Sequence, residues 1–130
     1  GDHRISVSDS NGVYNESNRK KIQVKSVKLD SVLTELHPLK TLIWIDVQGY
    51  EGHVLAGAKN ILKNKIPLVI EFWPYGLNRT SGLPLLISSL SEYKGFYDLA
   101  SPGEFHNINE LNLYYNKIGL DGKFVDLLVL

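Results

Sequence analysis

The most regular pattern of hydrophobic and polar positions lies between residues 41 and 74, where two apolar runs flank an amphipathic stretch. The first run covers residues 41–45 and ends at Asp46, and the second covers residues 68–73 and ends at Pro74. Between them, residues 50–65 carry apolar side chains at helical spacing: Val54, Leu55, Ala58, Ile61 and Leu62. The pattern predicts a strand, a helix and a second strand, with the strands parallel and the helix over one face of the sheet.

Acidic residues stand where these strands end. Asp46 closes the first strand, Glu71 lies near the end of the second, and Glu51 opens the helix. Ligands of open α/β sheets bind outside the carboxyl ends of the strands, so we predict that Asp46, Glu71 and Glu51 are catalytic residues. The structural alternative for Asp46 is a helix cap, and for Glu51 it is a favourable position at the positive end of the helix dipole. His53 is a further candidate base, with a surface position as the alternative.

The rest of the chain is predicted more coarsely. The expected elements are short strands at residues 4–8 and 22–26, a short helix from Asp30 or Ser31 to Leu36, a polar loop at 76–82, a helix at 83–93, a strand at 96–99, a long loop at 101–112, and a hairpin of residues 113–118 and 123–130 that turns at Asp121-Gly122. Lysines around residues 22–26 suit the exposed edge of a sheet better than a phosphate-binding patch.

Four linked segments together resemble the FkbM-type methyltransferases. They are Leu29-Asp30-Ser31-Val32-Leu33, Ile45-Asp46-Val47-Gln48-Gly49-Tyr50-Glu51, Val54-Leu55-Ala56-Gly57-Ala58 and Pro67-Leu68-Val69-Ile70-Glu71. The resemblance is good over roughly residues 20 to 75, and the segments 95–99 and 124–128 look like the last two strands of the family.

The resemblance implies an S-adenosylmethionine-dependent methyltransferase with a partial Rossmann-like sheet, which transfers methyl to the hydroxyl of a small molecule. It implies that Gln48 and Gly49 shape the cofactor side and that Trp44 or Trp73 closes the pocket. The family commonly has Lys where this chain has Trp44, and Glu where it has Gln48. Because an amide cannot accept a proton as a carboxylate does, the base must be a residue other than Gln48.

The cofactor loop of the family is absent from these residues. No glycine-rich Gly-x-Gly-x-x-Gly turn occurs, and the chain contains no Met. We therefore expect residues 1–130 to be the C-terminal part of one methyltransferase domain, with weak or no cofactor binding alone. The uncovered sheet edge would then favour a homo-oligomer. The alternative from another class is a non-catalytic interaction domain that keeps the fold.

Composition narrows the class of partner. The 14 basic and 14 acidic side chains balance, which argues against nucleic acid and an anionic membrane as partners. No apolar run approaches the length of a bilayer span, and we expect a soluble, cytoplasmic protein. Cysteine is absent, so thiolate chemistry is excluded. A divalent cation held by Asp46, Glu51, Glu71 and His53 is an alternative use of the same residues, although the main prediction includes no metal.

Overall fold

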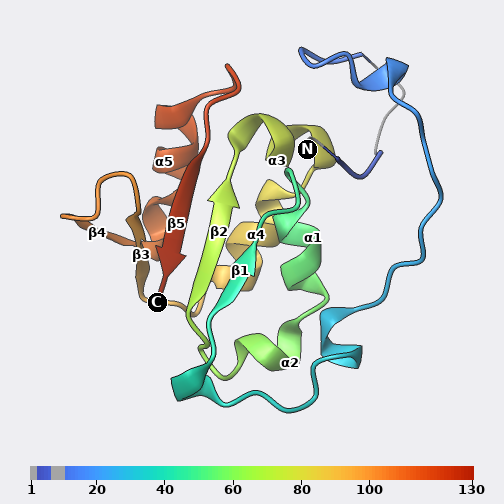
Figure 1. Cartoon of the computed structure of the whole chain (residues 1–130). Helices are drawn as coiled ribbons and strands as arrows, with labels where there is room; N and C mark the ends of the chain where they lie inside the picture. Colours follow the sequence, from blue (N-terminus) through green and yellow to red (C-terminus); the bar gives the residue numbers. More distant parts are fainter. Residues whose placement is uncertain (1–2, 7–10) are drawn as a thin grey trace.

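The chain is built on one five-stranded mixed sheet, as seen in a computed structural model that describes residues 3–6 and 11–130 (Figure 1). The strands are β1 (Ile43–Ile45), β2 (Leu68–Phe72), β3 (Gly95–Asp98), β4 (Phe105–Asn107) and β5 (Val125–Val129). Their order across the sheet is β1-β2-β5-β3-β4. The pair β1–β2 is parallel, as the hydrophobic pattern predicted, and the other pairs are antiparallel. The expected mixed α/β class is confirmed.

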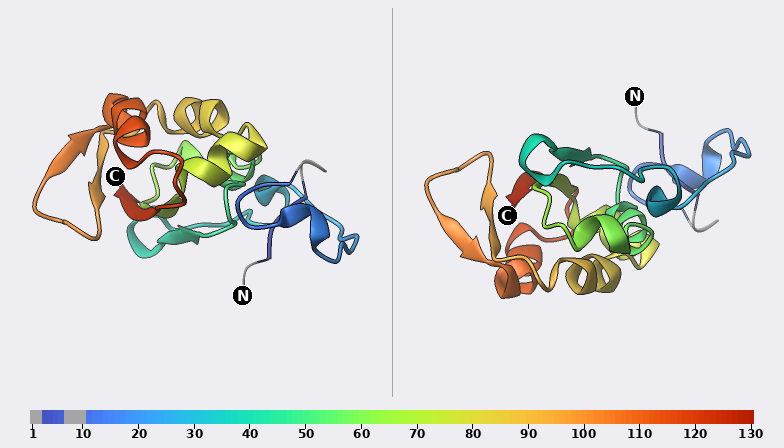
Figure 2. Two further views of the ribbon diagram at one scale, coloured as in Figure 1. Left: turned by 90° about the horizontal axis from the view of Figure 1, so that it is seen from above. Right: turned by 90° about the horizontal axis from the view of Figure 1, so that it is seen from below.

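The helices gather on one side of this sheet (Figure 2). They are α1 (Glu51–Ala56), α2 (Lys59–Leu62), α3 (Pro74–Thr80), α4 (Leu83–Leu90) and α5 (Leu111–Ile118). Short 3-10 turns lie at Glu16–Asn18, Leu29–Ser31, Pro38–Lys40 and Ile108–Glu110. The hydrophobic core lies between the helices and the sheet, where Ile70 and Phe72 of β2 pack with Leu55, Leu86 and Leu111 from the helices. The opposite face of the sheet carries none of these helices, and we call it the open face.

The predicted helix over residues 50–65 is broken in two. The amide of Gly57 bonds to the carbonyl oxygens of His53 and Val54, which ends α1, and α2 begins at Lys59. The start of α2 is capped from a distance, because the carboxylate of Asp30 accepts hydrogen bonds from the amides of Asn60 and Ile61 at 3.0 to 3.2 Å. The helix expected from Asp30 to Leu36 was wrong, since only the 3-10 turn Leu29–Ser31 forms there.

The strands predicted near the N-terminus are not formed. Residues 20–28 are exposed and belong to no helix or strand. The next regular element is the 3-10 turn that begins at Leu29. Residues 3–6 are also outside any helix or strand, while positions 7 and 8 of the expected strand at 4–8 lie outside the described residues. The segment that contains Ile22, Val24 and Ser26 pairs with no strand of the sheet among the described residues, so its alternating pattern does not produce a strand.

Three further predictions, all for the region after β2, were wrong. The polar loop expected at residues 76–82 is mostly helix α3, which starts with Pro74 in its first turn. The long loop expected at 101–112 contains β4 and a helical start, where Asn107 and Glu110 form a capping box. Residues 113–118 belong to helix α5 rather than to a hairpin, so β5 pairs with β2 and β3 instead.

The predicted helix at 83–93 and strand at 96–99 are confirmed as α4 and β3 within a few residues. Among residues 3–6 and 11–130, no helix has the length and apolarity required to cross a bilayer.

Candidate active site

A residue of the turn after β1 is hydrogen-bonded to two of the predicted catalytic acids, Asp46 and Glu71. Because β1 and β2 are parallel neighbours, their carboxyl ends meet at one edge of the sheet. Gln48 lies between the acids, and its Nε2 donates to Asp46 Oδ1 at 2.8 Å and to Glu71 Oε2 at 3.0 Å. One amide group therefore holds a carboxylate from each strand end, a role that sequence reasoning did not assign to Gln48.

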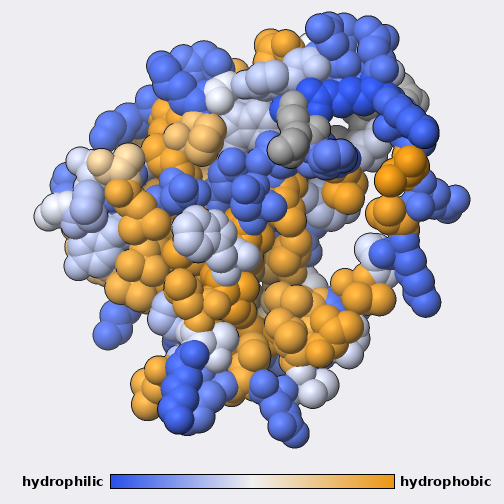
Figure 3. All heavy atoms as spheres, viewed as in Figure 1, coloured by the Kyte–Doolittle hydropathy of each residue, from blue (hydrophilic) through white to orange (hydrophobic). Residues whose placement is uncertain are grey.

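Sheet register places Trp44 and Glu71 on the open face. Trp44 is the partner of Val69 and Glu71 is the partner of Asp126, and paired residues share a face of a sheet. Trp44 is 64% exposed, whereas the neighbouring Ile43 and Ile45 point to the helix side and its core. Figure 3 shows this open face, with hydrophobic residues gathered over the middle of the sheet.

Glu71 has an unusual protonation equilibrium for a carboxylic acid. Only 7% of its surface is exposed, and this burial, with the negative charges of Asp46 and Glu51, raises the pKa of Glu71 to about 7. The hydrogen bond from Gln48 acts in the opposite direction, and the charge of Asp126 adds to the rise. Glu71 can therefore exchange a proton near neutral pH, as a general base must.

Glu51 is placed apart from this pair by its hydrogen bonds. Its Oε1 accepts from the backbone amides of Val47 and Gly49, both at 3.1 Å, and the side chain is fully buried. Burial raises the pKa of Glu51, although these amide bonds oppose the rise. The geometry favours a structural role in which Glu51 fixes the turn that carries Gln48.

The backbone of this turn is held in the left-handed region. Gln48 has φ of 55° and Gly49 has φ of 92°, and a Cβ on Gly49 would lie 2.4 Å from the carbonyl carbon of Gly76 in α3. The carbonyl oxygen of Gly49 accepts a hydrogen bond of 2.6 Å from Thr80 Oγ1. The amide and the carbonyl of Gly49 are thus both engaged within the protein, and α3 supports the turn from behind.

Comparison with known protein families identifies the family of this chain. The profile of one family, described as the Methyltransferase FkbM domain, matches residues 2–108, which is most of the 130 residues. The chain belongs to the FkbM methyltransferase family. No curated protein and no solved structure matches it.

Two other residues considered for the site have partners elsewhere in this FkbM domain. The Nε2 atom of His53 lies 2.9 Å from the carbonyl oxygen of Thr80, and its ring stacks on Tyr50. Trp73 donates from Nε1 to the carbonyl oxygen of Gly122 at 3.1 Å. Among the described residues, no group of three or more acidic, histidine or cysteine side chains is placed to hold a metal ion. The metal alternative therefore gains no support from the geometry.

Asp126 is a further acidic residue close to Glu71, and the sequence analysis did not single it out. It lies in β5, far along the chain from Glu71, and it reaches the site through strand pairing alone. The apolar run that contains Asp126 predicted the strand, but nothing local in the sequence indicated its partner.

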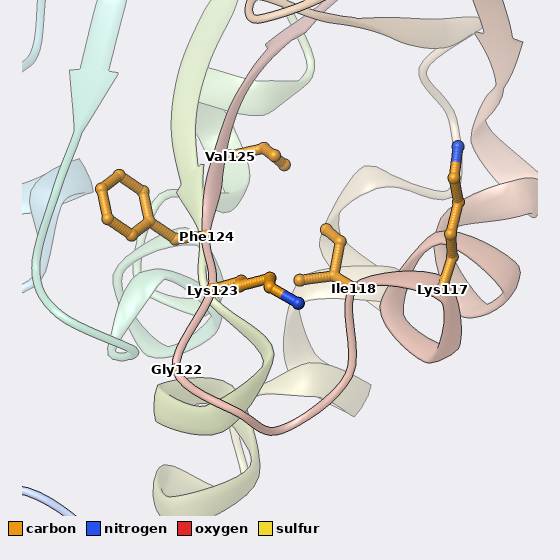
Figure 4. A pocket seen from close by; sticks show the side chains of 6 residues that line it. All are labelled: Lys117, Ile118, Gly122, Lys123, Phe124 and Val125. Carbon is orange, nitrogen blue, oxygen red and sulfur yellow. The ribbon is translucent and has the colours of Figure 1, made fainter.

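The surface of the FkbM domain has a hollow beside the start of β5. It is lined by Lys117 and Ile118 at the end of α5 and by residues 122–125 at the start of β5 (Figure 4). A second hollow lies between residues 38–42 and the segment that contains Asn64, Lys65 and Pro67. Asp46 and Glu71, at the ends of β1 and β2, line neither of these hollows.

Proposed function

We propose that this domain serves an S-adenosylmethionine-dependent methyltransferase that acts on a hydroxyl group of a small molecule. The observation that carries the proposal is the hydrogen-bonded chain Asp46–Gln48–Glu71 across the carboxyl ends of two parallel strands. Membership of the FkbM methyltransferase family supplies the reaction class.

The residues at this edge suit a positively charged methyl donor. Asp46 is an exposed carboxylate, and Asp126 adds a second negative charge on the open face. Trp44 offers an exposed indole ring two positions before Asp46, and aromatic faces attract cations. We infer that Trp44 and Gln48 would contact the donor, and that Gly49 contributes the shape of the turn. When bound, S-adenosylmethionine would supply an electrophilic methyl group.

Glu71 is the base in this proposal. Among the described residues only Gln48 bonds to its carboxylate, through Oε2, so Oε1 is left for an acceptor hydroxyl. With a pKa of about 7, close to half of the Glu71 side chains are ionised at neutral pH and can accept a proton. Asp46 then acts as the residue that fixes Gln48 and orients the acceptor, while Glu51 supports the turn.

The same proposal assigns residues 1–130 to the C-terminal part of a single Rossmann-like methyltransferase domain. Its support is that, among residues 3–6 and 11–130, β1 pairs only with β2, and that Trp44 is exposed on the sheet face. Further strands pairing with β1 would complete the cofactor site, and in their absence β1 would favour pairing between copies. We therefore expect weak or no cofactor binding by these residues alone.

Titration calorimetry with S-adenosylmethionine tests the two parts of the proposal separately. The experiment compares the 130-residue chain with a longer protein in which additional strands precede it. We expect measurable affinity only for the longer protein. Tight binding by the shorter chain would overturn the assignment to part of a domain, and no binding by either would overturn the cofactor.

The acids are tested in the longer protein by Asp46→Asn and Glu71→Gln. Each substitution keeps an acceptor for Gln48 Nε2 but removes a charge. Glu71→Gln is expected to abolish most methyl transfer with cofactor affinity kept. If Glu71→Gln left the rate unchanged, Glu71 would not be the base.

A further inference from the structure

A cluster of aromatic rings lies beside the end of β2, next to the proposed methyltransferase site but formed by other residues. Tyr14 comes from the N-terminal segment, Trp73 follows β2, and Tyr75 lies in the first turn of α3. The ring centroids are 5.8 Å apart for Tyr14 and Trp73, 5.4 Å for Tyr14 and Tyr75, and 5.2 Å for Trp73 and Tyr75. These three rings form what we call the aromatic cage.

A guanidinium group already occupies the cage. The Cζ atom of Arg4 lies 4.6 Å from the centroid of Tyr14 and 4.5 Å from that of Trp73. Both distances fall within the range of cation–π attraction, for which aromatic cages are a known means of binding cations. Arg4 belongs to residues 3–6, which form no helix or strand. Its side chain connects this segment to the cage.

Glu16 supplies a negative charge at the base of the cage. Its Oε1 accepts 2.8 Å from Tyr75 Oη and 3.2 Å from Arg4 Nη1, and Arg79 Nε lies 3.6 Å away. Burial opposes ionisation of Glu16, but hydrogen bonds from Tyr75 and from backbone amides, with the charge of Arg79, outweigh it and lower its pKa. Glu16 is therefore a carboxylate at neutral pH.

One oxygen of Glu16, Oε2, is buried and has no hydrogen bond among the described residues. The Glu16 side chain as a whole is 13% exposed. A hydrogen bond between a guanidinium and a carboxylate is stronger than one between neutral groups. Arg4 makes such a bond to Oε1.

Gly12 packs closely against the same atoms. A Cβ at position 12 would lie 2.1 Å from Tyr75 Oη and 2.5 Å from Glu16 Oε2. The backbone amide of Val13 donates to Tyr75 Oη at 3.0 Å, which holds the segment against the cage. A residue larger than glycine could not take this position without moving Tyr75 or Glu16.

We propose that the aromatic cage with Glu16 is a binding site for a small ligand that carries a guanidinium group, and that Arg4 occupies this site in the free chain. The ligand would displace Arg4, insert its planar cation between Tyr14 and Trp73, and donate a hydrogen bond to Glu16 Oε1 in place of Arg4. Release of residues 3–6 would accompany binding. The proposal does not depend on methyl transfer, because none of its residues belongs to the Asp46–Gln48–Glu71 chain.

Fluorescence of Trp73 reports on this site directly. The chain has two tryptophans, so Trp44→Phe leaves Trp73 as the single emitter. In that background, methylguanidinium chloride is titrated into the chain with Arg4 and into the Arg4→Ala variant, and methylammonium chloride at equal ionic strength serves as the reference salt. We expect a saturable change for Arg4→Ala that is specific to methylguanidinium. The chain with Arg4 should need about tenfold more probe, since its own guanidinium competes.

Two variants make the result decisive. Adding Glu16→Gln to Arg4→Ala should weaken binding about tenfold, because the charged acceptor is lost. The matched change Glu35→Gln, at an exposed carboxylate outside the cage, should have no effect. Equal affinity with and without Arg4, or no saturable response in a folded Arg4→Ala chain, would overturn the proposal.

If Arg4→Ala fails to fold, the unaltered chain gives the answer by NMR. Displacement of Arg4 by methylguanidinium should shift the ring protons of Tyr14 and Tyr75 together and with one saturation curve. Ring shifts that grow linearly with probe, as for methylammonium, would show that Arg4 is a permanent structural link and that the site does not exist.

Discussion

Glu71 on β2 and Asp126 on β5 are register partners across an antiparallel pair, so two carboxylates occupy neighbouring positions on one face of the sheet. Like charges placed opposite one another destabilise a sheet. Part of this cost is avoided when Glu71 keeps its proton, because burial and the surrounding acids raise its pKa to about 7. The register that completes the sheet therefore adds one of the smaller contributions to the raised pKa of the proposed base.

Glu71→Gln should change how stability depends on pH. The pKa of Glu71 is raised on folding from an ordinary value of 4.5 to about 7, so the folded chain binds more protons than the unfolded chain in this interval. The cost of burying Glu71 is absent below about pH 4.5 and fully present above pH 7. We expect equal stability of the two proteins at pH 4 and a gain on the order of 3 kcal/mol for Glu71→Gln at pH 8. Urea denaturation at several pH values measures this, and parallel curves for the two proteins would contradict it.

Asp126→Asn should lower the pKa of Glu71, because the nearest like charge across the sheet is removed. The effect is small, since the charge of Asp126 contributes less to the rise than burial and the charge of Asp46 do. At pH 8 we expect the variant to be more stable by roughly 0.2–1 kcal/mol. Carbon-13 NMR of the Glu71 carboxyl measures its titration, with Glu35→Gln as a control at an exposed acid. An unchanged titration midpoint would show that the two carboxylates do not interact.

Glu51→Ala tests whether this acid has a structural role. The substitution leaves the amides of Val47 and Gly49 buried without an acceptor and removes a fully buried side chain. We expect a loss of about 2–4 kcal/mol in the free energy of unfolding. Glu51→Gln should lose less, because its carbonyl oxygen can still accept from both amides. Unchanged stability of Glu51→Ala would return Glu51 to the list of catalytic candidates.

Local sequence predicted the part of the fold that local interactions determine. The run from β1 through α1 to β2 follows from apolar spacing and from the breaks at Gly49 and Pro67, and Asp46 and Glu71 were placed together correctly because parallel neighbours end at one edge. The catalytic role predicted for Glu51 stays a prediction, while its hydrogen bonds run back to the turn and favour a structural role. Gln48 bridges the two acids from a left-handed backbone conformation, which could not be predicted from the residue type.

The rest of the fold depends on contacts between distant residues. Asp126 reaches Glu71 only when β5 enters the sheet, and the turn at Asp121-Gly122 serves to receive Trp73 rather than to form a hairpin. The same holds for Arg4, which contacts Trp73 although the two residues lie far apart in the sequence. Periodicity placed Arg4, Trp73 and Asp126 in predicted strands, but it carries no information on which distant residue each of them contacts.

Asp30→Ala tests one of these distant contacts. The carboxylate caps α2 by accepting from Asn60 and Ile61, and the substitution would leave the first amides of that short helix without a partner. We expect a loss of about 1 kcal/mol, with a smaller loss for Asp30→Asn, whose side-chain oxygen can still cap. Hydrogen exchange of the Ile61 amide should speed up in Asp30→Ala. Unchanged exchange would mean that solvent replaces the cap without cost.

Gly49→Ala should be the most damaging single substitution in the turn that holds Gln48. A left-handed backbone costs a residue with a Cβ about 1–2 kcal/mol, and here the added Cβ would also lie 2.4 Å from backbone atoms of Gly76. Since both partners of this overlap are backbone, relief requires α3 to move away from β1, and we expect a loss of several kcal/mol in the free energy of unfolding. Gly103→Ala is the matched control, because a Cβ there meets no atom within 4 Å. The control should stay within about 0.5 kcal/mol of the unaltered chain in the same urea titration. Similar small losses for both variants would show that α3 does not hold the turn, and the support proposed for Gln48 between Asp46 and Glu71 would have to come from Glu51 alone.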